Sequence, residues 1–198
     1  MNQQGVDSGR RRFLTLTTSV VGGAGVVAAT VPFLASWKPS ERAKALGAPV
    51  EVDISEVQPG QLIVVAWRGK PTWVLRRTPD MLASLKKVDP YLLDPESKQD
   101  QQPNYIKGET RSIKPDYLVL IGVCTHLGCS PGFRPEHPAP EIDPHWQGGF
   151  YCPCHGSKFD LSGRVFKGVP APLNLVVPPY HFDGEMKVVV GEDPKGAA

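Results

Sequence analysis

The pattern of apolar and polar residues changes near residue 50. From Phe13 to Trp37 there are 25 residues without a charge. As a helix rising ~1.5 Å per residue, this run would measure roughly 37 Å, enough to cross a ~30 Å hydrocarbon core with some tilt. The pattern therefore predicts one transmembrane helix over residues 13–37.

After residue 50 the apolar residues fall in short runs that are typical of β-strands. These runs predict strands at residues 50–54, 61–67, 72–76, 117–123, 158–160, 164–166, 173–177 and 186–190. Asp183-Gly184 predicts a hairpin turn, and residues 79–87 predict one short helix. The polar stretch 89–116 is expected to be an irregular surface loop. The expected fold class is mostly β: a single N-terminal transmembrane helix and an antiparallel β head.

Composition and charge agree with this division. The 21 Pro and 20 Gly favour a loop-rich, mostly β fold. Residues 1–49 carry six Lys/Arg against two acids, a charge of +4, and residues 50–198 carry sixteen against eighteen, a charge of −2. The head at 50–198 is therefore not a basic nucleic-acid binder. The charged, Ala-rich residues 38–49 are predicted to be a tether and hinge.

The first twelve residues carry a targeting signal. Arg10-Arg11-Arg12-Phe13-Leu14 matches the twin-arginine export pattern, and a plain basic cluster before a membrane helix would predict the same orientation. Residues 1–12 are thus expected in the cytoplasm of a bacterial cell, with a single pass through the inner membrane and a periplasmic head. Ala43-x-Ala45 imitates a cleavage site, but it lies beyond a charged stretch, so we expect an uncleaved anchor.

Two short boxes hold all four cysteines. The first box is Cys124-Thr125-His126-Leu127-Gly128-Cys129 and the second is Cys152-Pro153-Cys154-His155-Gly156-Ser157. Six donors are too many for one tetrahedral metal. Four cysteines allow three pairings; pairing Cys129 with Cys154 leaves one Cys and one His in each box as ligands. Two thiolates with two neutral imidazoles suit either a zinc ion or a 2Fe–2S cluster with mixed ligation.

Both boxes resemble those of the Rieske iron–sulfur proteins, in which two Cys hold one iron and two His hold the other. With its anchor and tether, the chain is similar to the iron–sulfur subunits of bacterial ubiquinol–cytochrome c reductases, the cytochrome bc complexes. The resemblance is strongest from Leu118 to Val176, so the cluster-binding part is expected at about residues 118–176. It implies one 2Fe–2S cluster held by Cys124, His126, Cys152 and His155.

The resemblance also assigns residues around the cluster. Ser157 matches a serine that donates a hydrogen bond to a cluster sulfur. Phe159 stands where many respiratory members have a tyrosine whose hydroxyl bonds a ligand sulfur, so we expect a lower midpoint potential here. The segment Gly168-Val169-Pro170-Ala171-Pro172 resembles the proline loop that closes over the cluster. Gly168, Pro170, Pro172 and Leu127 are therefore expected close to it.

By the same resemblance, the chain transfers electrons from ubiquinol to a c-type cytochrome through a high-potential cluster, coupled to proton release. His126 or His155 would contact the quinol. The implied partners are a cytochrome b subunit, a c-type cytochrome subunit, ubiquinol and membrane lipid, within a dimeric complex. The alternatives are the exported Rieske subunit of a molybdenum oxidase such as arsenite oxidase, a Rieske ferredoxin of an oxygenase, and a zinc-stapled membrane module without redox function.

An insertion separates the two boxes. Twenty-five residues lie between His126 and Cys152, more than in short members of the family. The excess, Phe133 to Gln147, is rich in Pro and acids and is expected to be a surface loop. Its two histidines, His137 and His145, and the later His181 are not expected to be ligands.

Overall fold

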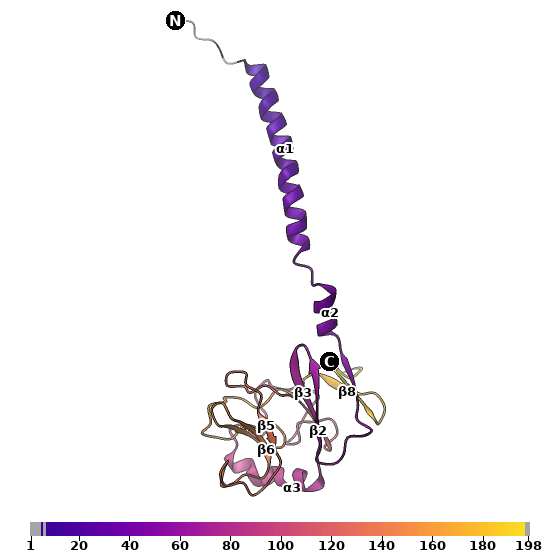
Figure 1. Cartoon of the computed structure of the whole chain (residues 1–198), viewed down its shortest axis with the longest axis vertical. Helices are drawn as coiled ribbons and strands as arrows, with labels where there is room; N and C mark the ends of the chain where they lie inside the picture. The colour runs from indigo at the N-terminus through magenta and orange to yellow at the C-terminus, as the bar shows by residue number, and fades with distance from the viewer. Residues whose placement is uncertain (1–4, 6, 197–198) are drawn as a thin grey trace. The chain divides into compact units, whose positions relative to one another are not determined.

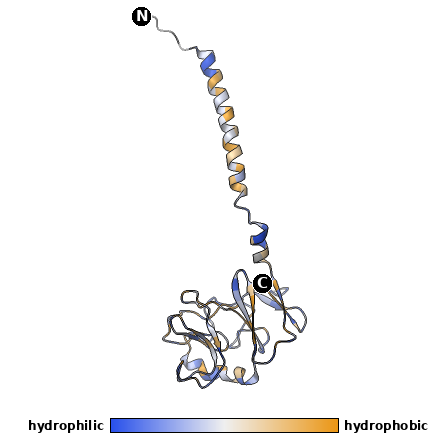
Figure 2. Cartoon of the chain, in the orientation of Figure 1, coloured by the Kyte–Doolittle hydropathy of each residue, from blue (hydrophilic) through white to orange (hydrophobic). Residues whose placement is uncertain are grey.

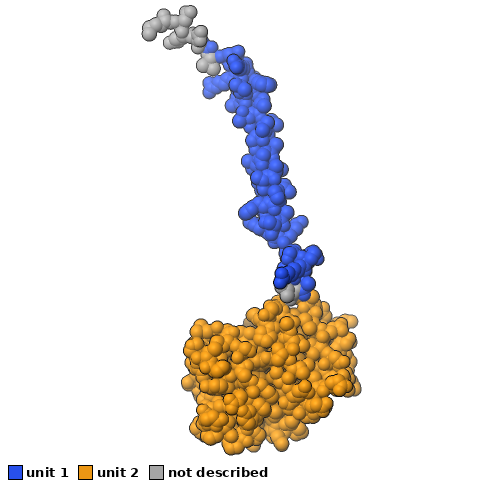
Figure 3. All heavy atoms as spheres, in the orientation of Figure 1, with its two compact units in different colours: residues 1–45 blue, residues 46–198 orange. Residues whose placement is uncertain are grey.

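The computed structural model describes residues 5 and 7–196 and has the element order shown in Figure 1. It divides into two compact units, Met1–Ala45 and Leu46–Ala198, coloured separately in Figure 3. The division falls inside the predicted tether.

The first unit is dominated by helix α1, Ser8–Ala35. Asp7 caps it, because its carboxylate accepts hydrogen bonds from the backbone N–H groups of Gly9 and Arg10 at 3.0 and 3.1 Å. The helix therefore begins before the predicted residue 13 and includes the arginines. It is long and apolar enough to cross a membrane, and none of its residues is buried. Figure 2 shows the apolar residues spread along it beyond its polar first turns.

A second helix, α2 at Glu41–Gly47, lies in the predicted tether. The Ser40 hydroxyl accepts the backbone N–H of Ala43 at 3.2 Å, and Lys44 pairs with Glu41 at 2.6 Å. The sequence interpretation recognised the charge and the alanines of this segment but did not predict a helix.

The second unit contains three antiparallel sheets of three strands each among the described residues. Their orders are β1-β9-β8, β2-β3-β4 and β5-β6-β7. The strands are β1 Val50–Asp53, β2 Leu62–Trp67, β3 Lys70–Arg76, β4 Tyr117–Ile121, β5 Gly132–Arg134, β6 Gly149–Cys152, β7 Ser157–Phe159, β8 Tyr180–Phe182 and β9 Lys187–Val190. The predicted fold class is confirmed. Helix α3, Pro79–Val88, is capped by Thr78 and followed by the 3₁₀ turn η1 at Asp89–Tyr91.

Several local predictions were wrong. Residues 173–177 are not a strand, although Leu175 and Val177 are buried as alternation predicts. Prolines at 172, 178 and 179 flank the segment and lack the N–H that a ladder needs. Its backbone instead makes single bonds to separate segments, such as Ile121 N–H to Val176 O at 2.8 Å. Residues 164–166 form only isolated bridges, and the short strands β5, β6 and β8 were missed.

The insertion between the boxes is a folded segment and not a plain surface loop. Trp146 and Ala139 are buried in a small second core with Val88, Leu92 and Phe166. Asp143 forms an ion pair with Lys158 of β7. The polar stretch 89–116 is likewise not merely a surface loop, since it buries Leu92, Ile106 and Arg111.

Three buried arginines join the separate parts of the head at one turn, residues 160–164. Arg77 donates to Leu161 O and to the Ser162 hydroxyl at 3.3 and 2.8 Å. Arg111 donates to Ser162 O and Gly163 O at 3.0 and 3.2 Å. Arg164 pairs with the buried Asp160 at 2.7 Å. Burial lowers the pKa of both Arg77 and Arg111 to about 10.

Candidate metal centre

The first box is a tight loop that follows strand β4. The backbone N–H of Cys124 donates to Cys129 O at 2.7 Å, and that of Gly128 donates to Cys124 O at 3.1 Å. Gly128 has a φ of 83°, which favours glycine because a Cβ is strained there. The two ends of the box are thereby held side by side.

The second box is the turn of the β6–β7 hairpin. Cys152 is paired with Ser157 across the two strands, and the backbone N–H of Gly156 donates to Cys152 O at 2.9 Å. Gly156 also has a positive φ, of 74°. Cys152 itself lies on a strand, which gives this ligand candidate a more rigid support than a loop alone.

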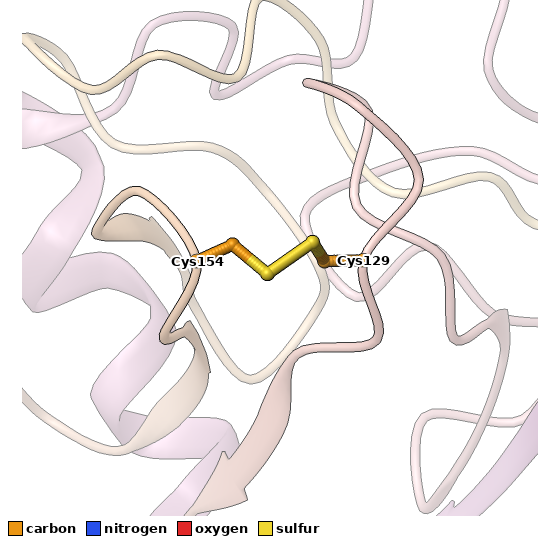
Figure 4. Close-up of a disulfide and its surroundings, with 2 residues drawn as sticks. All are labelled: Cys129 and Cys154. Atoms are coloured by element: carbon orange, nitrogen blue, oxygen red, sulfur yellow. A yellow bond between two sulfur atoms is a disulfide. The ribbon is translucent and has the colours of Figure 1, made fainter.

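A disulfide between Cys129 and Cys154 joins the two boxes, as Figure 4 shows. The sulfur atoms of Cys129, Cys152 and Cys154 lie within 4.8 Å of one another. That trio cannot bind a metal as it stands, because two of its sulfurs are already bonded together. The free thiols in the described chain are those of Cys124 and Cys152, both buried.

The remaining four donors separate into two pairs. Cys124 and Cys152 are both buried, and the neighbouring Cys152 side chain adds to the rise in the pKa of the Cys124 thiol. The rings of His126 and His155 have their centroids 4.8 Å apart and are nearly perpendicular, at 88°. His126 is half-buried and His155 is exposed. A buried pair of sulfurs beside an outer pair of imidazoles fits a cluster whose two irons take different ligands.

Burial raises the pKa of the Cys124 thiol, an effect opposed by a hydrogen bond from the backbone of His126. Metal ligation requires the thiolate, so binding of a metal would release this proton. A hydrogen bond with Ser157 acts in the same direction as that of His126 and favours the thiolate.

Residues 168–173 contact both boxes. The Ser157 hydroxyl accepts the backbone N–H of Ala171 at 3.1 Å, and the Thr125 hydroxyl donates to Leu173 O at 2.6 Å. The sequence interpretation named this segment but missed Thr125, because nothing in a lone threonine between two ligands indicates a distant carbonyl partner. Gly168, Pro170 and Pro172 are exposed.

Two expected neighbours of the cluster differ in burial. Leu127, in the first box, is 71% exposed, whereas Phe159 on β7 is fully buried in the same core as Cys124 and Cys152. The other histidines lie elsewhere within the described residues. The ring of His145 stacks on Tyr91 with centroids 3.8 Å apart, His137 is exposed, and His181 lies 3.4 Å from Glu192 O.

Comparison with known proteins places this site in a family. A family model described as the Rieske [2Fe-2S] domain matches residues 48–180. The chain belongs to the Rieske family. As a Rieske protein, it binds a 2Fe–2S cluster, and the donor chemistry described above fits that group. A second family model, described as the ubiquitinol-cytochrome C reductase Fe-S subunit TAT signal, matches residues 1–40.

Curated relatives of this Rieske protein match over nearly their whole length. The "Ubiquinol-cytochrome c reductase iron-sulfur subunit" of Allochromatium vinosum is 57% identical over 198 residues, covering 100% of this chain and 95% of the relative. The subunit of the same name from Rhodospirillum rubrum is 43% identical, covering 94% of each chain. That of Blastochloris viridis is 42% identical, covering 92% of each.

Proposed function

We propose that this Rieske protein is the iron–sulfur subunit of a bacterial ubiquinol–cytochrome c reductase and carries electrons from ubiquinol to a c-type cytochrome. The pair of outer imidazoles at His126 and His155 is the observation that carries the proposal, because a site that takes electrons from a quinol must also receive its protons. The full-length relatives bear the name of that enzyme, which disfavours the molybdenum-oxidase alternative.

Each residue has a proposed role. Cys124 and Cys152 hold one iron in the buried part of the site, and His126 and His155 hold the other. The cluster, when bound, supplies one-electron transfer at a potential raised by its neutral imidazole ligands. His155 is the more exposed of the two histidines, so its free ring nitrogen is the one proposed to accept the hydrogen bond and then the proton of ubiquinol.

The anchor and the disulfide support the proposed placement, and the names of the relatives support the proposed partners. Helix α1 holds the chain in the inner membrane, with residues 1–12 in the cytoplasm and the head in the periplasm, where a disulfide persists. The partners are a cytochrome b subunit and a c-type cytochrome subunit, in a dimeric complex. Residues 13–37 are the proposed anchor, 38–49 the tether and 50–198 the head, which the tether allows to move between the two partners.

An EPR-monitored redox titration of membranes, repeated across pH, tests this function. We expect a Rieske-type signal whose high midpoint potential falls as pH rises past the pKa of the ligand histidines. His155→Gln should abolish the signal, while the matched variant His145→Gln, which alters a ring stacked on Tyr91 and belongs to neither box, should keep it. A low, pH-independent midpoint would indicate an oxygenase-type ferredoxin, and zinc without an EPR signal would exclude electron transfer.

A further inference from the structure

One tryptophan contacts both chain segments that lead into the two boxes. Trp73, on β3, is only 5% exposed. Its indole stacks on the ring of Phe150 with centroids 4.8 Å apart and an interplanar angle of 15°. It also covers Gly122 so closely that a Cβ placed there would lie 2.2 Å from Cε2 of Trp73. No side chain could therefore be added at Gly122 without displacing the indole.

The two residues that Trp73 contacts, Gly122 and Phe150, occupy equivalent positions relative to the cysteines. Gly122 precedes Cys124 by two residues, and Phe150 precedes Cys152 by two residues. On strand β6, Phe150 and Cys152 point to the same face, because side chains alternate along a strand. Both are buried, at 0% and 2% exposure. The indole thus lies against the segment that leads into each of the two buried free cysteines, Cys124 and Cys152.

The backbone strengthens this arrangement on the side of the first box. The N–H of Gly122 donates to Pro71 O at 2.7 Å, two residues from Trp73 on the same strand. Trp73 is also paired with Leu120 of β4 in the strand register. The backbone hydrogen bond therefore fixes the segment that enters the first box to β3. The Trp73 ring sets how closely this segment can pack against β3.

We propose that Trp73 is a positioning residue of the metal centre and sets the separation between Cys124 and Cys152. This inference rests on the proposed function, because it assigns the two cysteines as ligands. An indole is large, flat and rigid, with only two side-chain torsions, so it acts as a spacer of fixed thickness between the two segments. Metal-site geometry then depends on a side chain that packs against the segments carrying the two cysteines.

Trp67 provides a matched comparison. It is buried to a similar degree, at 7% exposure, on the neighbouring strand β2. It also covers a glycine, since a Cβ on Gly191 would lie 2.5 Å from its Nε1. Gly191, however, follows β9 and is far in sequence from either box. Removing Trp67 therefore tests the loss of a buried indole without altering the supports of the cysteines.

The experiment compares Trp73→Leu with Trp67→Leu in the full chain in membranes. Three quantities are measured: the apparent unfolding temperature, the width of the Rieske EPR lines and the rate of iron loss to a chelator. Both variants should unfold at lower temperature. Only Trp73→Leu should broaden the EPR lines and lose iron about 10-fold faster, as expected when a support of metal ligands is removed. Trp73→Phe, which keeps a ring against Phe150, should retain most of the iron.

Equal line widths and equal rates of iron loss in the two leucine variants would overturn the role of Trp73. If Trp73→Leu does not accumulate, Gly122→Ala tests the role of Trp73 instead. The added methyl group would displace the indole without removing it. This variant should broaden the EPR lines, and adding Trp73→Phe should narrow them again; unchanged lines in Gly122→Ala would overturn the inference. A wild-type chain without a Rieske signal would instead overturn the proposed function.

Discussion

The turn at residues 160–164 depends on a single buried carboxylate. Asp160 is 1% exposed and accepts hydrogen bonds from the backbone N–H groups of Ser162 and Arg164 at 2.9 and 2.7 Å, and from Arg164 Nε at 2.8 Å. Arg164 has another acid, Asp89, at 2.7 Å, but that side chain is 40% exposed. Asp160 is therefore the main neutralising charge for the guanidiniums that meet at this turn.

Asp160→Asn keeps the size of the side chain and removes its charge. Breaking a buried ion pair by changing one partner costs about 3–5 kcal/mol, because a charge is left without compensation. For a unit of about this size, 1 kcal/mol corresponds to roughly 2–4 °C in unfolding temperature. We therefore expect Asp160→Asn to lower the unfolding temperature by about 6–20 °C.

Circular dichroism of the full chain in detergent, at one fixed scan rate, measures this change as an apparent unfolding temperature. Asp183→Asn is the matched control, because Asp183 is exposed and lies 3.6 Å from Lys187; it should shift the temperature by no more than about 2 °C. An Asp160→Asn protein that unfolds within about 3 °C of wild type would refute the reasoning. The buried arginines would then be stabilised mainly by their other acceptors, such as backbone carbonyls, the Ser162 hydroxyl and Asp89.

Three further predictions concern the metal centre and the tether. Phe159→Tyr should raise the midpoint potential by about 40 mV, if its hydroxyl gives a ligand sulfur a hydrogen bond worth ~1 kcal/mol more in the reduced state; potentiometric titration with no shift would contradict this. Replacing Cys129 and Cys154 together by serine removes a link across 25 residues and should cost about 3.5 kcal/mol of stability. Denaturant titration checks it, and a loss below about 1 kcal/mol would contradict the entropic estimate. Prolines at Ala43 and Ala45 should break helix α2 of the tether, because proline cannot donate the helical hydrogen bond, and should slow quinol–cytochrome c turnover in a steady-state assay; undiminished turnover would contradict a role of the tether in moving the head.

Residue spacing within the boxes carried most of the information about the site. Cys-x-His and Cys-x-x-His place two donors on one short loop, so the sequence alone predicts which residues lie together. The structure brings His126 and His155 together and bonds Cys129 to Cys154. The long uncharged run was equally informative, because crossing a membrane depends on length and composition alone.

Long-range partners were not visible in the sequence. Arg77 and Arg111 would ordinarily be placed on the surface. Their burial is explained by distant acceptors, among them the turn at 160–164. The segment 173–177 has the alternation of a strand, yet flanking prolines leave it without a ladder. Trp146 gave no sign of its burial, because its packing partner Phe166 comes 20 residues later. Local sequence patterns indicate which secondary structures a segment can adopt. Contacts with residues distant in sequence determine which of them it adopts.

The insertion between the boxes also has a practical consequence for protein engineering. Arg134 of β5 pairs with Gly149 of β6, so the inserted segment is closed at its base before the chain reaches the second box. A change in its outer length therefore need not be transmitted to the disulfide or to the histidines. Glu136, His137 and Pro138 are exposed at its surface, and this turn offers an attachment point for a fluorophore or spin label on the head.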